Sequence, residues 1–246
     1  MTDADRPTLT FFFPAYNEEE NVEETVRRAL EELGPMVDGS LEVLVVDDGS
    51  ADRTGELADA MAAANPRVRV HHQPNRGYGG ALKAGFTNAR GGLICFSDGD
   101  LQFDLGEMRL LLERLDDPRY PVDAVIGYRR QRRDPFHRTL IAKTYNAVIS
   151  VTFGLRVHDI DCAMKLFRRE VFDGLRLDSD GPFLSAELLV KLRARGTRIA
   201  QVGVTHYPRV AGQNTGASFR KILRTFRDIG RLRWALWFRR RSTLGG

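Results

Sequence analysis

Ser97-Asp98-Gly99-Asp100-Leu101-Gln102 follows the short apolar run 92–96, Gly-Leu-Ile-Cys-Phe, and this junction decides the fold class. The apolar run is typical of a buried strand. Asp98 and Asp100 come directly after its C-terminal end, which is the edge where open α/β sheets bind ligands. Side chains two residues apart point the same way along an extended chain, and Gly99 allows the backbone to approach closely. Because Mg²⁺ takes one or two protein carboxylates and completes its shell with water and substrate phosphate, we predict a cation holding a diphosphate here. The alternative is a solvated Asp-Gly-Asp turn.

Apolar, β-leaning runs alternate with helix-forming segments on both sides of this junction. Asn17 is expected to cap the first helix, because the three glutamates that follow it suit a helix N-terminus. A repeated β-α-β order predicts an α/β fold with a mostly parallel, Rossmann-like sheet and helices on both faces. The predicted strands are 8–13, 41–46, 68–72, 92–96 and 124–127, and the predicted helices include 52–64, 81–89 and 141–153.

Length and composition place the chain among ordinary globular proteins. Its 246 residues, 42% hydrophobic content and net charge of +4 suit one compact domain, residues 1–215, with a C-terminal amphipathic helical extension, residues 216–246. Cys95 and Cys162 stand alone in apolar surroundings, so we expect reduced, buried thiols and no zinc site. The start of the chain is polar and unlike a signal peptide, and no run approaches the roughly 20 apolar residues of a membrane span.

The other predicted strands of the first half also end in polar or glycine-rich segments. After the first strand, Tyr16 can lie along a base or ribose, although a plain strand, turn and cap also fits. After the second strand, Asp48 can accept from a base N–H or a ribose hydroxyl, or form a simple Asp-Gly turn. Residues 76–80, Arg-Gly-Tyr-Gly-Gly, lack the Gly-Lys-Ser/Thr of a P-loop and alone are weak evidence. Because these ends meet at one sheet edge, their coincidence favours a ligand site.

Together these motifs resemble those of family 2 glycosyltransferases with a GT-A fold. The similar segments are 14–18 (Pro-Ala-Tyr-Asn-Glu), 46–50 (Val-Asp-Asp-Gly-Ser), 76–80 and 98–100 (Asp-Gly-Asp). Within the family, the chain resembles the polyprenyl-phosphate (dolichyl-phosphate) mannose and glucose synthases. The resemblance implies an inverting transfer of a hexose from a UDP- or GDP-sugar, with Mg²⁺ or Mn²⁺ as cofactor.

The same resemblance implies the residues that bind the donor. Asp48 would meet the base, and Asp98 and Asp100 would bind the metal and the donor diphosphate. Gln102 matches a family glutamine beside the metal, so the implied metal set is Asp98, Asp100 and Gln102. The implied donor-binding set is Pro14, Ala15, Tyr16, Glu18, Asp48, Gly79, Lys83, Asp98, Gly99, Asp100 and Gln102.

A strongly basic segment, residues 129–138, follows the fifth predicted strand. Guanidinium groups hold phosphate through paired donors, and in the family this segment is the acceptor loop near the membrane surface. Of its arginines, we expect Arg129 and Arg138 to bind phosphate. A solvated charge run and an RNA-binding patch are the alternatives. Because aromatic residues are sparse within the segment, we expect no nucleic-acid partner.

The resemblance assigns further residues in the second half. Asp159 matches the family acid and Lys165 the family base, and Asp161 competes with Asp159 for its role. Glu187 matches a family glutamate that faces the site, although a lone helical glutamate is otherwise a surface residue. Arg209, in a His-x-Pro-Arg-like stretch, would bind donor or acceptor phosphate. The expected catalytic set is Asp100, Asp159, Glu187, Arg129, Arg138 and Arg209.

The charge of the acceptor decides the mechanism. A polyprenyl phosphate is already an anion near neutral pH, since its second pKa is about 6, and needs no strong general base. The site must offset repulsion between two anionic reactants and stabilise the leaving diphosphate. A hydroxyl acceptor would need a base, for which Asp159 and Glu187 are the candidates. The alternative functions are a soluble glycosyltransferase acting on a glycan or protein hydroxyl, and a non-catalytic nucleotide-sugar binding protein.

The C-terminal segment from about 218 to 240 combines an apolar stripe with many arginines, which is typical of a helix at a membrane surface. Trp234 and Trp237 suit a headgroup interface. A helix packed on the core or on a second subunit is the alternative. We therefore expect a cytoplasmic protein attached peripherally to an anionic membrane surface, at the inner face of the membrane.

Overall fold

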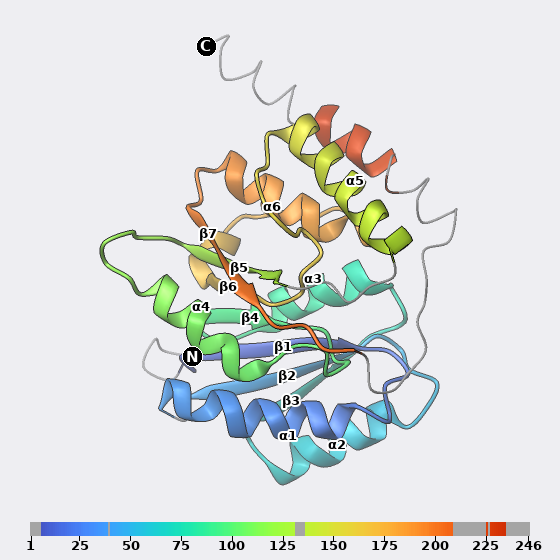
Figure 1. Cartoon of the computed structure of the whole chain (residues 1–246). Helices are drawn as coiled ribbons and strands as arrows, with labels where there is room; N and C mark the ends of the chain where they lie inside the picture. Colours follow the sequence, from blue (N-terminus) through green and yellow to red (C-terminus); the bar gives the residue numbers. More distant parts are fainter. Residues whose placement is uncertain (1–5, 39, 131–135, 209–224, 226, 235–246) are drawn as a thin grey trace.

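The computed structural model describes residues 6–38, 40–130, 136–208, 225 and 227–234, and its centre is a seven-stranded sheet (Figure 1). The strand order is β3-β2-β1-β4-β6-β5-β7. Neighbouring strands are parallel except at β6, which runs antiparallel to β4 and to β5. The mostly parallel sheet predicted from the sequence is thereby confirmed. The strands are β1 (Leu9–Ala15), β2 (Leu41–Asp47), β3 (Val68–His72), β4 (Leu93–Phe96), β5 (Ala124–Arg129), β6 (Lys165–Arg168) and β7 (Ile199–Val204).

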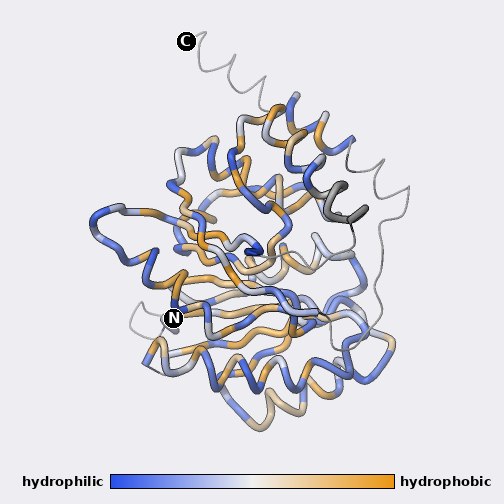
Figure 2. The backbone as a smooth tube through the Cα atoms, in the orientation of Figure 1, coloured by the Kyte–Doolittle hydropathy of each residue, from blue (hydrophilic) through white to orange (hydrophobic). Residues whose placement is uncertain are grey.

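Helices connect the strands and lie against the sheet, with α5 and α6 gathered at the end of the molecule beyond β5 and β7 (Figure 1). The strands carry nearly continuous hydrophobic colour, whereas the helices alternate between hydrophobic and hydrophilic residues (Figure 2). This contrast is expected when a parallel sheet is covered on both faces. The helices are α1 (Val22–Leu33), α2 (Thr54–Ala64), α3 (Tyr78–Asn88), α4 (Met108–Leu115), α5 (Phe136–Phe153) and α6 (Leu184–Ala194), with 3-10 turns η2 (Gly34–Val37), η3 (Leu105–Glu107) and η4 (Arg169–Phe172).

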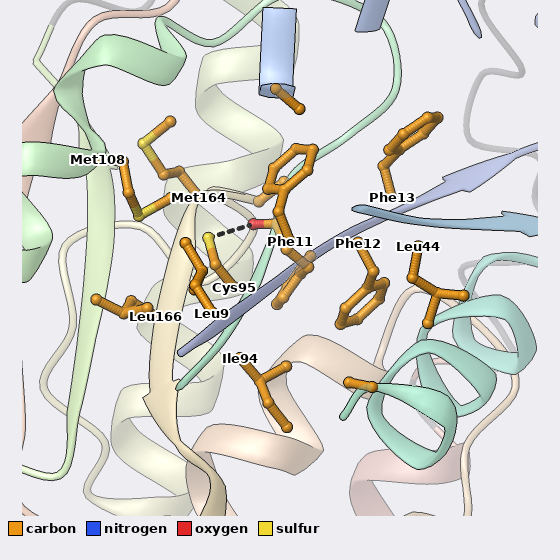
Figure 3. Close-up of a cluster of buried hydrophobic side chains, with 14 of the residues drawn as sticks. Leu9, Phe11, Phe12, Phe13, Leu44, Ile94, Cys95, Met108, Met164 and Leu166 are labelled. Atoms are coloured by element: carbon orange, nitrogen blue, oxygen red, sulfur yellow. Dashed lines mark hydrogen bonds between the residues drawn. The ribbon is translucent and has the colours of Figure 1, made fainter. Parts of the chain in front are cut away.

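The central strand β1 carries consecutive phenylalanines that supply both faces of the core. Successive side chains of a strand point to opposite faces, so Phe12 and Phe11 separate, with Met108 of α4 on the side of Phe11 (Figure 3). Phe12 packs edge-on against Phe86 of α3, with ring centroids 5.1 Å apart. A Cβ at Gly85 of the same helix would lie 2.1 Å from the Phe12 ring, so only glycine permits this close packing. Helices therefore cover both faces, as predicted.

The predicted cap of the first helix is wrong. Helix α1 begins at Val22, five residues beyond Asn17. Asn17 has a left-handed φ of 55°, and its side-chain oxygen accepts from the backbone N–H of Ala51 at 2.8 Å. Its own N–H donates to the Ser50 hydroxyl at 3.1 Å. Asn17 therefore joins the turn after β1 to the turn after β2, because a partner from the neighbouring strand outcompetes the local helix.

The second half contains two strands that the sequence did not predict. Lys165 begins β6 and is fully buried, so a charged residue interrupts the apolar pattern that would have indicated this strand. Most of β7 is half-buried at the edge of the sheet, which weakens its alternation. Two predicted helices also begin earlier than expected: α3 starts at Tyr78 within the glycine-rich segment, and α5 starts at Phe136.

The described part of the C-terminal extension, residues 227–234, is helical and packs on the domain. Ile229 and Leu232 are buried in a second hydrophobic cluster that includes Ile149 of α5 and Phe183, which directly precedes α6. Trp234 is 67% exposed. Trp237 and the rest of the segment lie outside the described residues. Within the described ranges, no helix is both long enough and apolar enough to cross a bilayer.

Candidate active site

The topology brings chemically distinct segments to one edge of the sheet. Ala15 of β1 pairs with Asp47 of β2, so both strands end level with each other. Phe96, the last residue of β4, pairs with Lys165, the first residue of β6. Because β6 runs in the opposite direction, the segment that precedes it arrives at the same edge as the segment that follows β4. The end of β5 at Arg129 lies there as well, since β5 is parallel to β4 through two antiparallel pairings.

Asp98 and Asp100 follow β4 at this edge, as predicted. Asp100 is buried, at 7% exposure, and Asp98 is half-buried. The hydroxyl of Tyr78 donates to Asp98 Oδ1 at 3.0 Å, and the backbone N–H of Gln102 donates to Asp100 Oδ1 at 3.2 Å. Leu101, between Asp100 and Gln102, has a left-handed φ of 59°, which is a costly conformation for a non-glycine residue. The chain therefore turns sharply just after the second carboxylate.

Gly99 lets this segment lie directly on β1. A Cβ on Gly99 would approach the Phe13 ring to 2.7 Å and the carbonyl oxygen of Pro14 to 3.2 Å. The Gly99 carbonyl also accepts from the hydroxyl of Thr25 in α1, at 3.3 Å. The backbone at Gly99 therefore approaches closely, as expected, and the segment it approaches is the neighbouring strand β1.

The carboxylate pair fits a divalent cation that is shared with a phosphate ligand. Burial raises the pKa of Asp98 to about 6, the charge of Asp100 adds to this effect, and the hydrogen bond from Tyr78 opposes it. A divalent cation relieves such repulsion between two poorly hydrated carboxylates. Within the described residues, no cluster of three or more His, Cys, Asp or Glu side chains could hold a metal. Two carboxylates suffice for Mg²⁺ when substrate phosphate completes its shell.

Asp48, the predicted contact to the base, lies at the end of β2 and is 4% exposed. Its Oδ1 accepts from Gln73 Nε2 at 2.6 Å and from the backbone N–H of Arg76 at 2.8 Å. Its own N–H donates to the carbonyl of Ala15 at 2.9 Å. Asp48 therefore fixes the ends of β1 and β2 and the segment after β3 relative to one another.

The other predicted nucleotide contacts surround the end of β1. Pro14 is half-buried and Ala15 is buried in the strand, whereas Tyr16 is 45% exposed beyond it. The Glu18 carboxylate accepts from Asn21 Nδ2 at 2.6 Å, and its N–H donates to a threonine hydroxyl at the start of α2 at 2.8 Å. Tyr16 is thus the exposed side chain of this group, on a turn held rigid by its neighbours.

Gln102, a predicted metal ligand, joins the segment after β4 to the segment after β7. Its side-chain N–H donates to the backbone carbonyl of Tyr207 at 3.0 Å, and its backbone carbonyl accepts from the Tyr207 N–H at 2.7 Å. Phe103 and His206 form a bridge beside this contact. Arg209 itself lies outside the described residues.

Arg129 and Asp159, predicted as a phosphate ligand and an acid, form one ion pair. The guanidinium donates Nε–H to Asp159 Oδ2 at 2.6 Å and Nη2–H to Oδ1 at 2.9 Å. The two side chains are only 13% and 5% exposed. Arg138 lies in α5, and its side chain is outside the described part of the chain. The positive charge of Arg129 opposes the rise in the pKa of Asp98, so the ion pair lies near the aspartates that follow β4.

Two further charged residues flank this pair. Lys165 is completely buried, its ammonium donates to the carbonyl of Cys162, and it lies 5.2 Å from the centre of the Phe96 ring. Burial lowers the pKa of Lys165. Asp161 is exposed. The ambiguity between Asp159 and Asp161 thus becomes a contrast between a buried, arginine-paired carboxylate and a solvent-accessible one.

Glu187, Lys83 and Gly79 meet around one loop, residues 178–181. Glu187 is 2% exposed and accepts from the backbone N–H groups of Asp178 and Ser179, both at 2.8 Å. Lys83 forms an ion pair with the side chain of Asp180. The Gly79 N–H donates to the carbonyl of Asp180 at 3.1 Å.

Tyr78 and the 178–181 loop were not among the predicted site residues. A tyrosine in a glycine-rich segment carries no signal of its own, and only its place in the first turn of α3 brings it to Asp98. The loop lies between recognisable motifs, so only the fold reveals its contact with α3.

A mostly parallel sheet with an Asp-Gly-Asp segment just after β4, at the edge where the other motifs meet, is typical of the GT-A glycosyltransferases, which use nucleotide-sugars. The chain belongs to glycosyl transferase family 2, whose profile matches residues 10–176. Both the fold and the broader of the two resemblances found in the sequence are thereby confirmed.

One relative in sequence and two solved structures of similar fold illustrate this assignment. Glycosyltransferase AglD from Haloferax volcanii is 35% identical over 243 residues, which is 96% of this chain but only 38% of that protein. Glucosyl-3-phosphoglycerate synthase from Mycobacterium tuberculosis with UDP shares the fold, with a TM-score of 0.67, 24% identity and 95% and 80% of the two chains covered. Mannosyltransferase PcManGT from Pyrobaculum calidifontis, in complex with GDP-Man and Mn²⁺, has a TM-score of 0.62, 24% identity and 85% and 59% coverage.

Proposed function

We propose that this protein is an inverting, metal-dependent glycosyltransferase that moves a hexose from a UDP- or GDP-sugar to a polyprenyl phosphate. The observation that carries the proposal is the buried, bidentate Arg129–Asp159 pair beside the Asp98 and Asp100 carboxylates. Both carboxylate oxygens of Asp159 already accept hydrogen bonds from Arg129, so Asp159 is poorly placed to take a proton from an acceptor hydroxyl. The arrangement therefore suits an acceptor that arrives already ionised, as a phosphate does.

The residues at the sheet edge have separate tasks in this proposal. Asp48 and the turn after β1 bind the nucleoside, and Asp98 and Asp100 hold Mg²⁺ or Mn²⁺, which when bound would stabilise the charge on the leaving diphosphate. In the proposal Arg129, held in place by Asp159, orients the acceptor phosphate. The Mn²⁺ and GDP-Man in the mannosyltransferase structure, and the Mn²⁺ and UDP in a glucosyl-3-phosphoglycerate synthase complex, support a metal and a nucleotide-sugar donor in this proposal.

A hydroxyl acceptor is the second candidate, and the exposure of Asp161 favours it. Asp161 lies two residues from the buried pair and meets solvent, so it can act as a base where Asp159 cannot. Transfer to a hydroxyl should then fall by about 100-fold or more in Asp161→Asn. Transfer to a polyprenyl phosphate should change much less in the same variant.

The deciding experiment measures nucleoside diphosphate release with UDP-glucose and with GDP-mannose, in Mg²⁺ or Mn²⁺, with and without a polyprenyl phosphate. Release that requires the lipid with one donor supports the proposal and identifies the sugar. Lipid-independent release that is lost in Asp161→Asn replaces it with the hydroxyl acceptor. Donor binding without any release would indicate a non-catalytic nucleotide-sugar binding protein.

A lipid acceptor would be met at a membrane, and we propose peripheral attachment to its cytoplasmic face. The exposed Trp234 on the described part of the C-terminal helix supports this location.

A further inference from the structure

Tyr78 joins the first turn of α3 to the metal-binding carboxylates. Its hydroxyl donates to Asp98 Oδ1 at 3.0 Å, and the residue as a whole is 36% exposed. A hydrogen bond to one carboxylate oxygen fixes the rotation of the group and leaves the other oxygen to face a cation. The orientation of Asp98 therefore depends on where the first turn of α3 is held.

The first turn of α3 rests directly on the backbone of the 178–181 loop. The Gly79 N–H donates to the Asp180 carbonyl at 3.1 Å. A Cβ on Gly79 would come within 2.6 Å of the Asp180 carbonyl carbon, and one on Gly77 within 3.3 Å of its oxygen. No side chain separates the two backbones at these points, so a shift of the loop displaces Tyr78.

Glu187 of α6 holds the backbone of the same loop. Its two carboxylate oxygens each accept one backbone N–H, from Asp178 and Ser179, at 2.8 Å. The Lys191 ammonium, 2.5 Å from Oε1, balances the charge. A buried carboxylate engaged in this way by both oxygens is suited to fixing the backbone and not to taking a proton from a substrate.

We propose that Glu187 is a positioning residue that acts through the 178–181 loop and Tyr78 to hold Asp98 in the orientation that binds the metal. The chain of contacts runs from the Glu187 carboxylate to the loop backbone, from the Asp180 carbonyl to Gly79, and from the Tyr78 hydroxyl to Asp98. Partners that orient metal ligands typically contribute 10–100-fold to metal affinity. The inference rests on the metal-dependent part of the proposed function and not on the identity of the acceptor.

The test measures Mn²⁺ affinity by electron paramagnetic resonance of free Mn²⁺, with UDP and with GDP at saturation. Tyr78→Phe removes only the hydroxyl, and we expect about tenfold weaker binding. Glu187→Gln replaces one acceptor oxygen with an NH₂ group that faces a backbone N–H of the loop. We expect a similar loss of Mn²⁺ affinity. Because both variants act on one chain of contacts, the double variant should bind no more weakly than the weaker single variant.

Matched controls distinguish this role from a general loss of structure. Tyr120→Phe alters an exposed tyrosine before β5, and Glu170→Gln an exposed glutamate after β6, both at the opposite edge of the sheet. Neither should change Mn²⁺ affinity. If Glu187→Gln fails to fold, Asp180→Asn weakens the ion pair between the loop and Lys83 at a partly exposed position and should also weaken Mn²⁺ binding.

Wild-type affinity in Tyr78→Phe would overturn the proposal, as would losses that simply add in the double variant. Wild-type Mn²⁺ affinity in Asp100→Asn would also overturn it, because the cation would then bind elsewhere. If Mn²⁺ affinity changes as expected while no hexose reaches a polyprenyl phosphate, the proposed acceptor fails and the positioning role stands.

Discussion

At the scale of single residues, Asp100 is the more deeply buried of the two carboxylates, and its charge is the feature to test. Asp100→Asn keeps the shape but removes the charge, so we expect metal-dependent release of nucleoside diphosphate to fall by at least about 100-fold. Unfolding by urea should occur at an equal or higher concentration, because repulsion from Asp98 is relieved. Asp116→Asn, an exposed change at the far edge, is the matched control. Near-normal turnover in Asp100→Asn would refute the metal assignment.

Gly99 tests how tightly the carboxylate segment lies on β1. Gly99→Ala would place a Cβ 2.7 Å from the Phe13 ring, so we expect about 1–3 kcal/mol of destabilisation from overpacking. Gly92→Ala at the opposite end of β4 is the matched control, since its nearest neighbour would lie 3.8 Å away. Urea unfolding of both variants gives the comparison. Equal stabilities would show that the segment can move away from β1 without cost.

At the scale of elements, the Arg129–Asp159 pair joins the end of β5 to the segment that precedes β6. Arg129→Met leaves the Asp159 carboxylate buried without its guanidinium, which should cost about 3–5 kcal/mol in the free energy of unfolding. The double variant Arg129→Met/Asp159→Leu removes both members of the pair and should be more stable than Arg129→Met alone. A double variant that is less stable than both singles would contradict this account.

One histidine of β3, His72, contacts a carboxylate of β2 and another of α2. His72 Nδ1 lies 2.9 Å from Asp47 and Nε2 lies 3.0 Å from Asp59. Hydrogen bonding to Asp47, and then to Asp59, raises the pKa of His72. Burial alone would raise the pKa of Asp47, but hydrogen bonds from Ser50 and His72 outweigh it and lower that pKa.

The sign of the pH dependence follows from these two shifts. The contribution of protonated His72 is complete below its unfolded pKa of about 6.5 and is lost as the pH rises through the higher folded value. The contribution of Asp47 is present above its ordinary pKa and is lost as the pH falls through the lowered folded value. Because His72 is half-exposed, we expect a change of less than about 1 kcal/mol between pH 6 and 8. Urea unfolding of wild type and His72→Asn at both pH values measures this change in the free energy of unfolding. The same change with pH in the variant would refute the role of His72.

The elements of the first half could be predicted because each strand is a short apolar run followed by a turn. The helix cap could not be predicted, since Asn17 finds its partner at Ala51, which is far along the chain but lies in the turn after the neighbouring strand β2. Strand β6 was missed because its first residue is Lys165, whose burial depends on tertiary contacts with Phe96 and Cys162. Sequence pattern thus fails where a long-range contact reverses a local preference.

The same limit applies to the site. Asp98 and Asp100 could be located from the strand that precedes them, and the structure brings them to the predicted edge. Motif resemblance marked Glu187 but gave no indication that both its oxygens bind backbone N–H groups. Hydrogen-bond partners of a buried carboxylate come from the fold, so a motif can identify the residue and still leave its task open.

At the scale of the whole molecule, the buried apolar side chains of the described residues form two hydrophobic clusters. The larger one fills both faces of the sheet around β1, and the smaller one lies among α5, α6 and residues 227–234. The strands that end beside the carboxylates pack in the first cluster, while the described C-terminal helix packs in the second. The helix can therefore present one face to the domain and another outward.

This division predicts opposite outcomes for two neighbouring residues of that helix. Leu232 is 6% exposed, so Leu232→Ala should destabilise the protein by about 2–4 kcal/mol in urea unfolding. Trp234 is 67% exposed, so Trp234→Ala should change stability by less than about 0.5 kcal/mol. If the outward face binds a membrane, Trp234→Ala should reduce flotation with vesicles containing anionic lipid, and added salt should reduce it further. Absence of wild-type flotation, or equal flotation of the Trp234 variant, would leave the helix with a packing role and remove the membrane from the proposed function.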